Sequence, residues 1–192
     1  MTPIRAFCAA LLLLHGLADF GRAQQPSPAP SQSPSPPPAE EKQRTAKQTK
    51  KELEHLACGP SHVHLVYHLA DAPQTLPEPP PDKGLIYVIR TRKNPIGGVE
   101  QANFAMDGKW VGVNHIGNYF YLEADPGPHY FCLKYWGGPP VLLSMVVEKA
   151  KTYYLLENDV FGGISIDLID EKEGKGDVAK YHRSSFEVKQ KK

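Results

Sequence analysis

Three histidines lie close together in the chain at a spacing that could bind a transition metal. His62, His64 and His68 are separated by two and four residues, within a run that alternates apolar and polar side chains. In a β-strand this spacing places all three on one face. Imidazole nitrogens bind Zn²⁺ and Cu²⁺ well, but no acidic residue or cysteine has a matching spacing to complete the site. We therefore expect no metal and no cofactor, and these histidines are the candidate ligands if a metal is bound.

Aromatic side chains are the second group that could bind a ligand. Trp136 precedes the segment GGPP, which must end a strand, so we expect Trp136 at the tip of a loop. An exposed tryptophan there could stack on a sugar or contact a partner protein. Tyr135 and Trp110 are expected to contribute to the same contact. The alternative is that Trp136 is buried and covers the end of the hydrophobic core.

Residues for nucleophilic or phosphate chemistry do not occur in the patterns that such chemistry needs. No serine lies in a G-x-S-x-G turn. No glycine-rich loop follows a strand and opens a helix, as a phosphate site requires. The sequence therefore predicts a protein that is not an enzyme. The alternative is a metal-dependent or hydrolytic enzyme that uses the face of His62, His64 and His68.

Residues 1–23 are predicted to be a secretory signal peptide. Arg5 precedes an apolar run that ends near Leu17, and small residues at Gly21 and Ala23 form a cleavage site. The run is too short for a stable membrane span, so we expect an exported protein of the periplasm or cell envelope. The alternative is a leader that stays in place as an anchor.

The cysteines fit this compartment. The leader contains Cys8, so its removal leaves Cys58 and Cys132, an even pair that suggests a disulfide in an exported protein. Two free buried thiols are the alternative. Cleavage also removes two arginines and one aspartate, which brings the formal net charge from +1 to zero. A neutral chain excludes nucleic acid as an expected partner.

The next segments predict a spacer followed by one folded domain. Residues 24–38 (QQPSPAPSQSPSPPP) have almost nothing to bury and are expected to be a disordered, extended linker. Residues 39–56 are rich in helix formers and predict a short helix that leads into Cys58. We place the spacer and this helical segment at 24–57, the domain at 58–186 and a tail at 187–192. The charged residues after 172 are expected to form a short helix or a loose end.

The domain is predicted to be an all-β, antiparallel sandwich of about seven to nine strands, of the immunoglobulin or prealbumin type. Tight turns are expected at Asp107-Gly108 and Asp125-Pro126-Gly127. The continuous apolar run at 85–90 predicts a central strand covered on both faces. The expected strands are Val63–Leu69, Leu85–Arg90, Gln101–Met106, Lys109–Val113, Asn118–Glu123, His129–Tyr135, Val141–Glu148, Lys151–Glu157 and Ile164–Leu168.

Five segments in order resemble the bacterial domain-of-unknown-function 2846 family over about residues 83–172. They are GLIYVIR, Asp107-Gly108-Lys109, Gly117–Phe120, Glu123–His129 and Ala150–Tyr154. The chain departs from the family at Ala150, where glycine is more usual, and it has no lipid-attachment cysteine. The resemblance implies a small β-sandwich of the bacterial envelope in which Cys58 and Cys132 are a recurring pair. It implies no activity, substrate or catalytic residue.

Together these features predict a non-catalytic β-sandwich that binds an envelope protein or polymer. A carbohydrate-binding module that uses Trp136 is the second alternative, beside the histidine-based enzyme.

Overall fold

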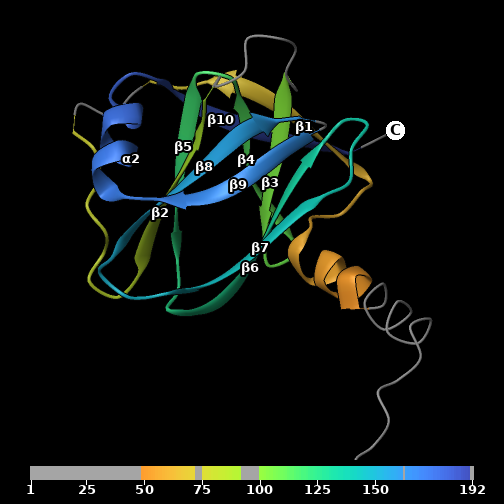
Figure 1. The fold of residues 1–192 in the computed structure, drawn as a ribbon, viewed down its shortest axis with the longest axis horizontal. Coiled ribbons are helices and arrows are strands. Elements are labelled where there is room, and N and C mark those ends of the chain that lie inside the picture. Colours follow the sequence, from red (N-terminus) through yellow and green to blue (C-terminus); the bar gives the residue numbers. More distant parts are fainter. Residues whose placement is uncertain (1–48, 72–74, 92–99, 162, 191–192) are drawn as a thin grey trace, which may run out of the picture. The chain divides into compact units, whose positions relative to one another are not determined.

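Two β-sheets pack face to face in the computed structural model, which describes residues 49–71, 75–91, 100–161 and 163–190 (Figure 1). The larger sheet has the order β1 (Val63–Leu69), β10 (His182–Gln190), β5 (Asn118–Ala124), β2 (Gly84–Arg90), β8 (Thr152–Val160) and β9 (Gly163–Ile169). The smaller has the order β4 (Lys109–His115), β3 (Gln101–Met106), β6 (Gly127–Tyr135) and β7 (Val141–Val147). The predicted β-sandwich is confirmed. The predicted signal peptide and proline-rich spacer lie outside the described residues.

Strand β2 lies at the centre of the larger sheet and is buried at every position. Ile86 and Val88 face the smaller sheet and pack with Phe104, Phe131 and other residues of the main core. The alternate residues of β2 face the opposite way and join a second apolar cluster, which helix α2 (Glu171–Val178) completes through Val178. A strand covered on both faces has little room for polar side chains, so the prediction made from the apolar run is confirmed.

The chain after residue 170 forms the short helix that was expected, α2, and then a strand that was not expected. Asp170 caps α2 by accepting a hydrogen bond from the backbone N–H of Glu173, 2.9 Å away. The chain then forms β10, which reaches Gln190 and so extends beyond the predicted domain end at 186 and through most of the predicted tail at 187–192. Most of β10 is half-buried or exposed, and it is held by backbone pairing with β1 over its full overlap. Its side chains therefore carry little of the apolar alternation that reveals a strand.

Two further predictions about the sheets were wrong in detail. The larger sheet is mixed, because β2 pairs in parallel with β8 and β10 pairs in parallel with β5. Alternation along the predicted strand Ile164–Leu168 places Leu168 on the inward face with Ile164 and Ile166, but Leu168 is 58% exposed. The core ends before this residue, since β9 is an edge strand of its sheet.

A disulfide fixes the start of the domain to the smaller sheet. The helix over residues 49–57 leads into Cys58, as predicted, and Cys58 is bonded to Cys132 with a Cα–Cα distance of 4.9 Å. Cys132 is fully buried on the outer face of β6, where it packs with Ala57 and Ala105. The bond spans a sequence separation of 74 residues, for which loop-closure entropy gives a stabilisation of about 4 kcal/mol. No helix in the described part of the chain is both long and apolar enough to cross a membrane.

Two of the segments that carry the family resemblance are tied together by His129. Asp107 and Gly108 both have positive φ, 49° and 77°, as the predicted tight turn requires. The Asp107 carboxylate accepts hydrogen bonds from Nδ1 of His129 at 2.6 Å and from the backbone N–H of Tyr130 at 2.9 Å. The other ring nitrogen, Nε2, donates to the carbonyl of Asp125 at 2.7 Å. Since both ring nitrogens face acceptors, this geometry favours the charged imidazolium.

Ala150 also has a left-handed backbone, with φ of 56°. Its N–H donates to the carbonyl of Lys83 at 2.8 Å, which holds the turn before β8 in place. This conformation is unfavourable for an L-residue with a Cβ and is adopted readily by glycine. The position is the one at which the chain departs from the glycine more usual in the family that it resembles.

Candidate ligand-binding groove

A groove of about 590 Å³ lies on the outer face of the smaller sheet, between the start of β1 and the turn that follows β6. We call it the groove below. All three predicted ligand contacts, Trp110, Tyr135 and Trp136, line it. The remaining lining residues come from three segments and are Pro60, Ser61, Val63, His64, Leu65, Gln101, Asn103, Lys134, Gly137 and Gly138.

Trp110 forms a fixed wall of the groove. Its indole N–H donates to the carbonyl of Pro60 at 2.9 Å. Its ring lies against Gly59 so closely that a Cβ at that position would overlap it. Because Cys58 is bonded to Cys132, the segment that holds the ring is itself covalently attached to the sheet. The ring is therefore preorganised before any ligand arrives.

Trp136 lies at the tip of the turn after β6, as predicted. Its side chain is 96% exposed, which contradicts the alternative of a tryptophan buried at the end of the core. Tyr135 plays a different part, since its ring packs against the main core and leaves no room for a side chain at Gly138. Tyr135 thus supports the turn, while Trp136 is the ring that can meet a ligand.

The polar residues of the groove were not predicted from the sequence. Gln101 and Asn103 occupy alternate positions of β3, and Lys134 of β6 lies directly opposite Asn103 in the register. Nε2 of Gln101 donates to Oδ1 of Asn103 at 2.9 Å, and Oε1 of Gln101 accepts from Nε2 of His115 at 3.4 Å. Gln101 and Asn103 alternate along the strand with the apolar residues Ala102 and Phe104. This alternation was the signal in the sequence that places the two amides on the outer face of the sheet.

His115 is held behind the groove rather than in it. Its ring stacks on Tyr67 with the ring centroids 3.9 Å apart. Burial lowers the pKa of His115, and the charge of Arg90 adds to this effect although Glu100 opposes it. A neutral imidazole can donate one N–H, and the bond to Gln101 uses it. The orientation of the Gln101 amide at the floor of the groove is thereby fixed.

The structure separates the three histidines that were the candidate metal ligands. His64 lines the groove, His62 lines an adjacent hollow, and His68, on the edge strand β1, lies 3.8 Å from Glu187. Within the described residues, no three His, Cys, Asp or Glu side chains gather closely enough to hold a metal ion.

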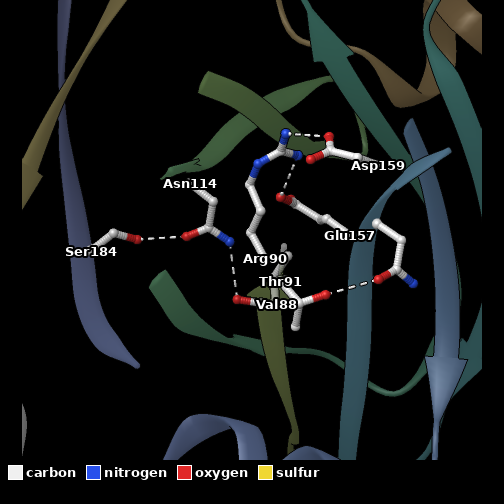
Figure 2. Close-up of polar contacts among 8 residues, drawn as sticks. Val88, Arg90, Thr91, Asn114, Glu157, Asp159 and Ser184 are labelled. Atoms are coloured by element: carbon white, nitrogen blue, oxygen red, sulfur yellow. Dashed lines mark hydrogen bonds and ion pairs between the residues drawn. The ribbon is translucent and has the colours of Figure 1, made fainter. Parts of the chain in front are cut away.

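A buried cluster of charged groups lies inside the sandwich, away from the groove (Figure 2). Nη2 of Arg90 lies 3.0 Å from Oδ1 of Asp159, and Nη1 lies 3.6 Å from Oε2 of Glu157. The side chains of Arg90 and Glu157 are fully buried. Burial raises the pKa of Glu157 to about 8, although the charge of Arg90 opposes the rise. The cluster is enclosed by the core, so we assign it to the fold and return to its stability below.

The fold and the groove define a β-sandwich with an open, tryptophan-lined site on one sheet face. No family model, curated protein or solved structure matches the chain.

Proposed function

We propose that this protein is a non-catalytic, exported bacterial binding module that holds a carbohydrate chain of the cell envelope in the groove. The observation that carries the proposal is the placement of both tryptophans of the chain, Trp110 and Trp136, in the lining of one groove. The same lining contains the amides of Gln101 and Asn103 and the ammonium group of Lys134.

The chemistry of these groups suits a sugar. Flat aromatic rings pack well against the apolar C–H face of a pyranose ring. Amide and ammonium groups can donate to its hydroxyl oxygens, and the amides can also accept. A few polar groups beside aromatic walls are typical of sites that fix a small ligand in one orientation.

Two features support an envelope location. The leader predicted at residues 1–23 directs export, and the disulfide between Cys58 and Cys132 suits an oxidising compartment. The resemblance to an envelope family points the same way. The predicted proline-rich spacer at 24–38 would then act as an extended linker that lets the domain contact the envelope at a distance from the N-terminus of the mature chain.

Tryptophan fluorescence tests the proposal directly, because both emitting rings line the groove. The protein is titrated with soluble peptidoglycan fragments and with neutral oligosaccharides. We expect a saturable change in emission with at least one of them. Trp136→Ala should weaken binding, measured by calorimetry, by about tenfold, which is the value of one aromatic contact.

Phe161→Ala is the matched control, since Phe161 is also fully exposed but does not line the groove. It should bind like the wild type. An equal loss of affinity in both variants, or the absence of any response to glycans, would contradict a carbohydrate site in the groove. Binding of an envelope protein at the same surface would instead favour the protein-binding alternative.

A further inference from the structure

The groove is basic, although the chain as a whole is nearly neutral. The formal net charge of the full chain is only +1. Yet the described residues that line the groove include Lys134 and His64, and none of them is an aspartate or a glutamate. A local excess of cationic groups is therefore a property of this surface and not of the whole molecule.

Lys134 is the central charge of this surface. It lies opposite Asn103 across the β3–β6 pair, on the face that carries Cys132. Among the described residues its ammonium group forms no ion pair. Its ammonium group offers three N–H donors, and it lines the same groove as both tryptophans.

The basic surface continues beyond the groove toward the helix over residues 49–57. A second hollow, of about 560 Å³, is lined by Lys51, His55 and His62, and Glu54 is the one acidic residue among its described lining residues. Lys134 lines this hollow as well as the groove. The two are therefore adjacent parts of one surface, with Lys134 where they meet.

We propose that the ligand of the groove is an acidic oligosaccharide, whose carboxylate pairs with Lys134 while a sugar ring packs on Trp136. This inference rests on the proposed function and specifies its ligand class. Charge complementarity selects a carboxylate-bearing chain over a neutral one. The tryptophan rings select a sugar over an acidic peptide, because an extended acidic side chain offers no flat face for them.

Paired glycans test this proposal. Oligosaccharides containing glucuronate, galacturonate or N-acetylmuramate are compared with the same chains after their carboxyl groups have been reduced to alcohols. The wild type should bind the acidic member of at least one pair about fivefold or more tightly than its reduced form. This preference should shrink as salt is added, because salt screens the exposed charge.

Lys134→Gln should remove the preference, so that the acidic chain and its reduced form bind the variant with similar affinity. Lys172→Gln is the matched control, since Lys172 is an exposed lysine of α2 that lines neither hollow. It should retain the preference. Thermal unfolding of each variant establishes that it is folded.

The outcomes separate the two proposals. If Trp136→Ala abolishes glycan binding but acidic and reduced chains bind equally, the carbohydrate function stands and the acidic ligand is wrong. If poly-glutamate binds in the groove and no glycan does, both proposals are wrong. A preference for acidic chains that persists in Lys134→Gln would also contradict the role of Lys134.

Discussion

Replacing Glu157 by glutamine should stabilise the protein, and the gain should grow as pH rises. Two carboxylates, Glu157 and Asp159, share the single guanidinium group of Arg90 inside the sandwich. Asp159 is the closer partner at 3.0 Å. If both acids were ionised, a net negative charge would be buried. Loss of hydration instead raises the pKa of Glu157 to about 8 against the opposing charge of Arg90, so Glu157 carries a proton near neutral pH.

The sign of the pH dependence follows from this pKa. A carboxyl group whose pKa is higher in the folded state binds protons more tightly when folded, so rising pH lowers the free energy of unfolding. The loss begins at the ordinary value of 4.5 and is complete above about 8. At about 1.4 kcal/mol for each pH unit, the whole window corresponds to at most about 5 kcal/mol. Glutamine has the shape of the protonated acid and does not titrate, so Glu157→Gln removes this loss.

The assay is urea unfolding of the wild type and Glu157→Gln at pH values from 5 to 9. The two proteins should be similar in stability at pH 5, and the variant should be several kcal/mol more stable at pH 9. Glu123→Gln is the control, because Glu123 is an exposed glutamate that forms only a surface ion pair with Lys83, at 3.8 Å. A difference that does not change with pH, or one that favours the wild type at high pH, would show that Glu157 is ionised in the fold.

Two other backbone and side-chain features give further predictions. Ala150→Gly should raise the free energy of unfolding by about 1 kcal/mol, because φ is 56° there. Ala179→Gly, at a φ of −66°, is the control and should lower the free energy of unfolding in the same denaturation experiment. A lower free energy of unfolding in both variants would contradict strain at Ala150. Burial alone lowers the pKa of His129, but its hydrogen bonds to Asp107 and to the Asp125 carbonyl outweigh this and raise the pKa. The stabilisation by His129 is therefore complete below the ordinary pKa of 6.5 and is lost as pH rises through the folded value. Asp107→Asn should remove this part of the pH dependence in thermal unfolding, and an unchanged profile would refute it.

The sequence predicts an element correctly where the local pattern of apolar and turn residues matches the burial and backbone conformation of that same segment. The run at 85–90 shows no alternation of apolar and polar residues because β2 is covered on both faces. The tight turn at Asp107-Gly108 requires positive φ at both residues, which this residue pair accepts. The pair Cys58 and Cys132 followed from export and from the resemblance, and the disulfide is present. By contrast, β10 is held by backbone pairing with β1, and the parallel pairing of β2 with β8 joins strands far apart in the chain. Neither leaves a periodic mark on its own segment.

The same distinction explains which parts of the groove could be predicted. Trp136 is flanked by turn residues, so its exposure is a local property that the sequence reveals. Gln101 and Lys134 are ordinary polar positions on alternating strands, and nothing nearby in the chain separates them from solvent-facing residues. They form one site because β3 and β6 pair and because the disulfide brings residues 58–61 across the same sheet face. The polar residues of the groove can be recognised as one site only when the pairing of the strands is known. An exposed aromatic ring next to a turn can be predicted from the sequence. This is why the proposed ligand contact could be placed at Trp136 beforehand, and why the charge that we infer to select the ligand, on Lys134, could not.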